Sequence, residues 1–238
     1  MLKFQLFLKK KLWILLFSST LSIPLLAQNI VDHDLFTNSA TIQSILFKGE
    51  LFDGYGSRSP NDGSTYFAYT LNFEKGEVLF RGKLYRDVLI NLNAFEDEIY
   101  ISDLFGNYLL VNKDYVDSFS MGNLPFVHYK QEPNSILNSG YYQVLYMGNV
   151  KLFKKIQKKY YEENVTWSQT RSKGYKLSES FYLWKGDNWY RINRKADLKR
   201  CFPDQTKAID QLSRTRKLNF RKNTERTLIE TLTYIDNL

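Results

Sequence analysis

The chain of 238 residues contains few cysteine, histidine, proline and glycine residues: 1 Cys, 2 His, 5 Pro and 12 Gly. A single Cys excludes an internal disulfide framework and any zinc cluster held by several cysteines. The low Gly and Pro content excludes collagen-like and low-complexity proteins. With 43% hydrophobic and 16% aromatic residues, the chain can bury a core, so it is not an intrinsically disordered protein.

The sequence also lacks the well-marked nucleotide-binding and catalytic motifs. It contains neither G-x-x-x-x-G-K-[ST] nor a G-x-G-x-x-G that follows a strand, and neither G-x-S-x-G nor H-E-x-x-H. This excludes the enzyme classes that those motifs identify. Enzymes without such motifs remain open. No cofactor is predicted.

Residues 1–27 predict a secretory signal peptide. A basic start without acidic residues leads into an apolar run, Leu12–Leu26, and the small residue Ala27 precedes a cleavage point. The alternative is an uncleaved membrane anchor, but the run of 15 residues contains Pro24 and a spanning helix needs about 20. We therefore expect export to the periplasm or cell surface, with no transmembrane span in the mature chain.

Charge is divided unevenly along the chain. The net charge is +8, and removal of the four lysines in residues 1–27 leaves +4. Residues 28–150 carry a net charge of −7, whereas residues 151–238 carry +11. Either the two halves dock on each other, or the C-terminal half presents a basic surface to an acidic partner.

Residues 28–161 predict a β-rich body. Short apolar and aromatic runs such as EVLF, LYRDVLINL, EIYI and YLLV are separated by turn residues. Between the first two runs, Arg81-Gly82-Lys83 predicts a hairpin turn. A further hairpin is predicted at Gly148-Asn149, a typical two-residue hairpin loop that joins YYQVLYM to VKLFKKIQKKYY. Residues 150–161 also fit a helix. This pattern favours an antiparallel sheet, a sandwich or a partly closed barrel.

The rest of the chain predicts a change from strands to helices. Residues 162–180 look like a polar linker, and residues 181–238 start with an aromatic hairpin, FYLWKGDNWYRI, followed by basic helices. After Ile192 the apolar residues recur at helical spacing, as in NTERTLIETLTYIDNL. The predicted fold is therefore mainly β with a small α-helical C-terminal segment, α+β overall.

Taken together, these segments resemble a known group of proteins. GEVLFRGKLYRDVLINLNAFEDEIYI, GYYQVLYMGNVKLFKK and FYLWKGDNWYRI, followed by Lys/Arg-rich helices, are similar to a family of signal-peptide-bearing, β-rich envelope proteins of unknown function from Gram-negative bacteria. The resemblance covers about residues 45–238 and rests on structural motifs. It implies an envelope location and brings no catalytic residues.

Single reactive residues give weak signals. Cys201 lies between Arg200 and Phe202 without a catalytic His signature, so we expect a small buried residue. His33 sits between two aspartates that a strand would place on its opposite face, and no second His follows at helical spacing. No metal site is predicted.

The acidic run Glu96-Asp97-Glu98 is the strongest candidate for a hydrolase site. Glycoside hydrolysis needs two carboxyl groups about 5–10 Å apart across a cleft. Neighbouring positions in a turn do not supply that geometry. We expect a solvated turn here and assign no catalytic residue.

The positive signal is the interleaving of aromatic and basic residues in the C-terminal half. Such surfaces bind sugar rings, peptides or single-stranded nucleic acid. The predicted binding residues are Lys154, Lys155, Lys158, Lys159, Trp184, Trp189, Tyr190 and Arg191. The alternative is that the rings form the core of the sheet and the lysines are solvated. Nucleic acid is disfavoured as a partner, because export separates the protein from it.

The sequence therefore favours a non-catalytic binding or interaction module of the bacterial cell envelope. Its basic C-terminal surface would contact an acidic envelope component or partner protein. The alternatives are a hydrolase with a cryptic Asp/Glu site and a structural subunit of an envelope assembly.

Overall fold

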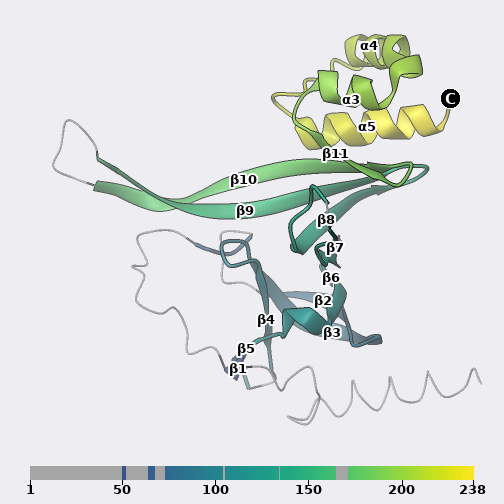
Figure 1. Cartoon of the computed structure of the whole chain (residues 1–238). Helices are drawn as coiled ribbons and strands as arrows, with labels where there is room; N and C mark the ends of the chain where they lie inside the picture. Colours follow the sequence, from purple (N-terminus) through teal and green to yellow (C-terminus); the bar gives the residue numbers. More distant parts are fainter. Residues whose placement is uncertain (1–49, 52–63, 68–72, 104, 134, 165–170) are drawn as a thin grey trace, which may run out of the picture. The chain divides into compact units, whose positions relative to one another are not determined.

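A computed structural model describes residues 50–51, 64–67, 73–103, 105–133, 135–164 and 171–238. In these residues an eleven-stranded antiparallel sheet is followed by three α-helices (Figure 1). This confirms the predicted mainly β fold with a helical C-terminal segment. The predicted signal peptide lies outside the described residues.

Most strands of the described part of the chain pair with the strand before or after them in the sequence. The strands are β1 (Glu50–Leu51), β2 (Glu74–Phe80), β3 (Lys83–Asn93), β4 (Glu98–Ser102), β5 (Tyr108–Leu110), β6 (Val116–Met121), β7 (Leu124–Tyr129), β8 (Gly140–Met147), β9 (Lys151–Asn164), β10 (Arg171–Lys185) and β11 (Asn188–Ile192). Their order across the sheet is β1-β5-β4-β3-β2-β6-β7-β8-β9-β10-β11, and the exceptions to pairing between sequence neighbours are the pairs β1–β5 and β2–β6. The helices are α3 (Lys195–Cys201), α4 (Thr206–Thr215) and α5 (Thr224–Asp236), with 3₁₀ turns η3 (Lys113–Tyr115) and η4 (Pro203–Gln205).

Two tight turns fix the register of hairpins that the sequence predicts. Arg81 and Gly82 between β2 and β3 have φ of 52° and 72°. Gly186 and Asp187 between β10 and β11 have φ of 53° and 59°. Two successive positive φ angles are the signature of a two-residue turn whose twist matches that of the flanking strands.

Strands β9 and β10 form a long hairpin that the sequence does not predict. Their register runs without a break from the pair Arg171–Asn164 to the pair Trp184–Lys151. Residues 171–180, predicted as part of a polar linker, therefore belong to a strand, and residues 151–161 are not helical. The backbone N–H and C=O groups of such strands are paired with the neighbouring strand whatever the side chains are. A strand with polar residues on both faces therefore has the sequence pattern of a linker.

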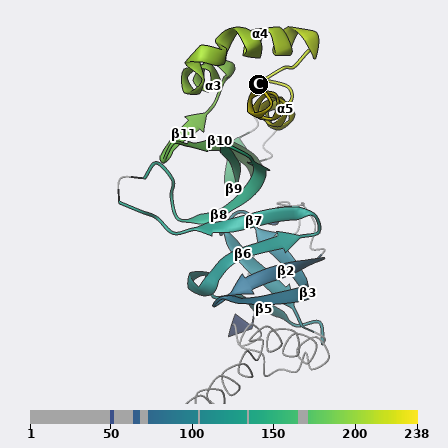
Figure 2. The same cartoon turned by 90° about the vertical axis from the view of Figure 1, so that its right-hand side faces the viewer.

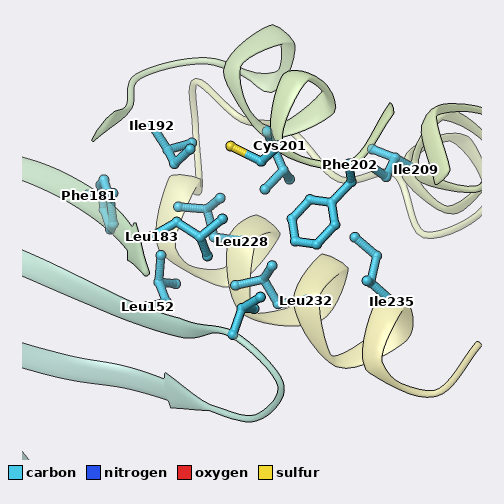
Figure 3. Close-up of a cluster of buried hydrophobic side chains, with 12 residues drawn as sticks. Leu152, Phe181, Leu183, Ile192, Cys201, Phe202, Ile209, Leu228, Leu232 and Ile235 are labelled. Carbon is cyan, nitrogen blue, oxygen red and sulfur yellow. The ribbon is translucent and has the colours of Figure 1, made fainter. Parts of the chain in front are cut away.

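The helices and one face of the sheet share a core (Figure 3). Leu152 on β9, Leu183 on β10, and Leu228 and Leu232 on α5 are each 0% exposed. Figure 2 also places α3 next to β11, with α4 on the far side of α3 and α5 from the sheet. The helices are therefore part of the same hydrophobic core as β8–β11 and do not form a separate domain.

The sheet bends so that its two halves meet. The backbone N–H of Lys158 on β9 donates to the carbonyl oxygen of Ala94, just after β3, at 2.8 Å. Residues 94–97, between β3 and β4, thereby lie against β9, and Asp97 also contacts Tyr141 on β8. This contact brings acidic residues of the N-terminal half to lysines of the C-terminal half.

In the described part of the chain, no helix combines the length and the apolar character that crossing a membrane would require.

Candidate binding surfaces

Lys154, Lys155 and Lys158, which the sequence predicts as binding residues, are buried, with exposed fractions of 6%, 5% and 2%. Their side chains bind groups within the chain and do not form an outer surface. Lys159 and Tyr160, further along the same strand, are exposed. These three lysines are buried because other parts of the chain pack against β9. The spacing of the lysines in the sequence does not reveal that packing.

Lys154 connects the sheet to the last helix. Its Nζ lies 2.6 Å from Glu225 Oε2 on α5 and 3.6 Å from Glu179 Oε1 on β10. A buried ammonium group needs such partners, because its desolvation is costly. This lysine therefore helps to hold α5 on the sheet.

Lys155 connects the two halves of the sheet. Its Nζ donates to Asp97 Oδ1 at 2.6 Å and to the carbonyl oxygen of Tyr141 at 3.1 Å. Burial lowers the pKa of Lys155, and the charge of Asp97 acts in the opposite direction. Asp97 Oδ2 also lies 3.1 Å from Lys113 Nζ. The carboxylate is thus shared by Lys155 on β9 and Lys113 on η3.

Lys158 is held by the backbone of residues 64–66. Its Nζ donates to the carbonyl oxygen of Ser64 at 2.8 Å and also to that of Tyr66. Burial lowers the pKa of Lys158 to about 8. This lysine fixes the segment before β2 against β9.

The acidic run at 96–98 is part of this internal network. The side chain of Asp97 is only 18% exposed, so the turn is not the solvated one that the sequence predicts. Glu98 Oε1 lies 3.5 Å from the same Lys113 Nζ, and burial raises the pKa of Glu98. Two carboxylates that converge on one ammonium group stabilise a junction of strands; they do not face each other across a cleft as hydrolysis would require.

Other reactive side chains are also shielded from solvent, since His128 is half-buried and Cys201 is buried. The His128 ring places Nδ1 3.0 Å from the carbonyl oxygen of Val116, and burial lowers its pKa. Burial raises the pKa of the Cys201 thiol, which disfavours the reactive thiolate. Within the described residues, no group of three or more His, Cys, Asp or Glu side chains is placed to hold a metal ion. His33 lies outside those residues.

Two carboxylates of the helical segment, Asp210 and Glu230, each pair with two cations. Asp210 on α4 lies 2.7 Å from Lys195 and 2.6 Å from Lys199. Hydrogen bonds from these two lysines lower the pKa of Asp210 to about 2. Glu230 on α5 pairs in the same way with two arginines, Arg216 and Arg226.

Arg194 and Arg200 pair with Asp197, which leaves five cations of this segment without a carboxylate partner among the described residues. Those on α4 and on the connection to α5 are exposed. We call this set the cationic surface: Lys207, Arg214, Lys217, Arg221 and Lys222. Within the described part of the chain, no ion pair involves any of them.

Helix α4 holds two of these cations outward. Ile209 and Leu212 are buried at 1% and 6% exposure, three residues apart on the inner face of the helix. Lys207 and Arg214 are seven residues, or about two turns, apart, and so share another face. Both line a surface hollow of about 530 Å³ together with Asp210, whose carboxylate is paired with Lys195 and Lys199. The sheet and its core thereby support a fixed array of positive charge.

The predicted aromatic residues do not all share a face. Trp184 and Trp189 pair across β10 and β11, with ring centroids 5.0 Å apart. Tyr190 pairs with Leu183, whose side chain belongs to the core under the helices. Because side chains alternate along a strand, Tyr190 lies on the opposite face from Trp189, and Arg191 lies on the same face as Trp189.

No family model, curated protein or solved structure matches this chain. The resemblance to an envelope family therefore stays a prediction.

Proposed function

We propose that this protein is an exported, non-catalytic binding module of the bacterial cell envelope, which contacts an acidic partner through the cationic surface. The observation that carries the proposal is the absence of carboxylate partners for Lys207, Arg214, Lys217, Arg221 and Lys222 in the described part of the chain. Like charges held close together repel one another, and an anionic partner relieves that repulsion.

The distribution of carboxylates supports this use of α4. Asp210 and Glu230 are each occupied by two cations. The basic excess of the C-terminal half is therefore only partly neutralised within the fold. What remains lies on α4 and on the connection from α4 to α5, and α4 joins the core shared with the sheet through Ile209. A rigid, unneutralised array favours fast and salt-sensitive association with a polyanion.

Charge reversal at three residues of the cationic surface tests the proposal. We expect the wild-type protein to be retained on immobilised heparin and released by salt. For the variant Lys207→Glu, Arg214→Glu and Lys217→Glu, we expect the affinity for heparin to fall at least about 100-fold. Each cation near an anionic surface contributes about 1 kcal/mol.

The matched control reverses three exposed lysines elsewhere, Lys75, Lys130 and Lys176, and so has the same net charge as the test variant. We expect this control to keep most of its retention. Equal loss in the two variants would contradict the proposal, since net charge alone would then explain the binding. Failure of the wild-type protein to bind would also contradict it.

A further inference from the structure

The sheet face opposite the helices carries a second surface, which we call the aromatic face. Its members contact one another edge to face or at a tilt, with ring centroids 5.0–6.2 Å apart. They are Tyr129, Tyr142, Phe153, Tyr182, Trp184 and Trp189. Tyr129, Tyr182, Trp184 and Trp189 are only partly buried.

Strand register arranges this face in two rows. Residues that pair directly across antiparallel strands project from the same face. One row is Met147, Lys151, Trp184 and Trp189, across β8–β11. The other row is Val144, Phe153, Tyr182 and Arg191. Each row therefore combines aromatic rings with one cation.

The two faces of β9–β11 differ in composition and in what covers them. The helix-facing side carries Leu152, Phe181, Leu183 and Ile192, which are buried under α3–α5 (Figure 3). On the aromatic face, Leu137 from the β7–β8 connection packs against Tyr142 and Phe153. Trp184 and Trp189 still remain partly exposed there.

The two cations of the rows lack acidic partners. Lys151 and Arg191 are exposed. Arg191 Nη2 lies 3.3 Å from the hydroxyl of Ser180, and neither side chain forms an ion pair with a described residue. Partly exposed rings flanked by unneutralised cations match a ligand that has flat apolar faces and negative groups.

We propose that the aromatic face binds an anionic polysaccharide chain. The C–H faces of sugar rings would stack on Trp184, Trp189 and Tyr182, and acidic groups of the chain would contact Lys151 and Arg191. The ligand lies on the opposite side of the sheet from the cationic surface, so this site is additional to the proposed contact with an acidic partner.

The size of the face favours a polysaccharide over a protein partner. Four strands at about 4.8 Å spacing span about 14 Å, and the two rows are about 7 Å apart along the strands. A stable protein interface needs about 800 Å² on each partner, far more than this strip provides. A narrow chain that lies across the strands fits the strip.

Titration with a galacturonate hexamer tests the proposal, with neutral maltohexaose as the comparison ligand. We expect the wild-type protein to bind the acidic hexamer more tightly. Trp184→Ala is expected to weaken binding about 10-fold, because loss of one stacked ring has effects of this order. The double variant Lys151→Gln and Arg191→Gln should remove the preference for the acidic ligand. Both of its positions are exposed, so its fold is expected to persist even if Trp184→Ala perturbs folding.

Tyr190→Ala is the matched control, because Tyr190 is 39% exposed on the other face of β11. We expect it to bind as the wild type does. The variant Lys207→Glu, Arg214→Glu and Lys217→Glu should also bind the hexamer normally, which separates this site from the cationic surface. The proposal is overturned if the wild type binds no oligosaccharide, if Tyr190→Ala weakens binding as much as Trp184→Ala, or if only an aromatic-rich peptide binds.

Discussion

Replacement of Asp97 by Asn is expected to destabilise the protein by about 3–5 kcal/mol, the usual cost of removing one partner of a buried ion pair. Lys155, 5% exposed, would keep its charge but lose the carboxylate that lies 2.6 Å away. Asp97 Oδ2 also lies 3.3 Å from the backbone N of Tyr141, so the substitution weakens a second contact. Urea unfolding of the variant and the wild type measures the difference in free energy.

Two further variants make this expectation specific. Lys155→Met should cost less than Asp97→Asn, because Asp97 would keep Lys113 at 3.1 Å. Glu77→Gln should cost less than about 1 kcal/mol, because Glu77 and its partner Arg86 have side chains 50% and 51% exposed. Equal effects of Asp97→Asn and Glu77→Gln would contradict the role assigned to Asp97.

The loss in free energy of unfolding caused by Asp97→Asn should also depend on pH. Burial holds the pKa of Lys155 below its value in the unfolded chain. Between the folded and the unfolded pKa, the unfolded chain binds more protons, so this group makes stability rise with pH. Loss of Asp97 lowers the folded pKa further and strengthens the effect. We therefore expect the difference between variant and wild type to shrink as the pH is raised from neutrality toward the unfolded pKa of lysine.

Replacement of Leu232 by Ala is expected to destabilise the protein by about 2–5 kcal/mol, the range for large-to-small changes in a core. Leu232 is 0% exposed on α5 and packs in the cluster that includes Leu152 and Leu183 of the sheet (Figure 3). Because helices and strands share this cluster, loss of the side chain weakens both. Far-ultraviolet circular dichroism and tryptophan fluorescence should report one coincident unfolding transition.

Leu238→Ala is the control for this change, because Leu238 is 68% exposed at the C-terminal end of the chain. We expect its effect to stay within about 0.5 kcal/mol. If Leu232→Ala produced an early helical transition while the sheet remained folded, α3–α5 would form an independent unit and the shared core would be wrong.

Local patterns in the sequence predict much of this fold. Turn chemistry at Arg81-Gly82 and Gly186-Asp187 predicts two hairpins that the structure confirms. Helical spacing of Leu228, Leu232 and Ile235 predicts the buried face of α5. These features depend on residues close together in the chain, so they can be inferred without knowing the topology.

The features that depend on distant pairing could not be predicted. Asp97 and Lys155 are 58 residues apart, and only the bend of the sheet makes them neighbours. For the same reason, a run of lysines on β9 suggests an exposed basic strip although Lys154 and Lys158 are buried. The polar part of β10, residues 171–180, is recognisable as a strand only once β9 is placed beside it.

The salt dependence of heparin affinity tests the role of the cationic surface most directly. Because cation–polyanion contacts release counterions, affinity should fall steeply as salt concentration rises, and the slope should reflect the number of contacts. We predict a shallower slope and weaker binding for the variant Lys207→Glu, Arg214→Glu and Lys217→Glu than for the wild type, and a slope close to wild type for Lys75→Glu, Lys130→Glu and Lys176→Glu. Identical slopes for the two variants would show that these residues of α4 and its C-terminal end do not form the contact.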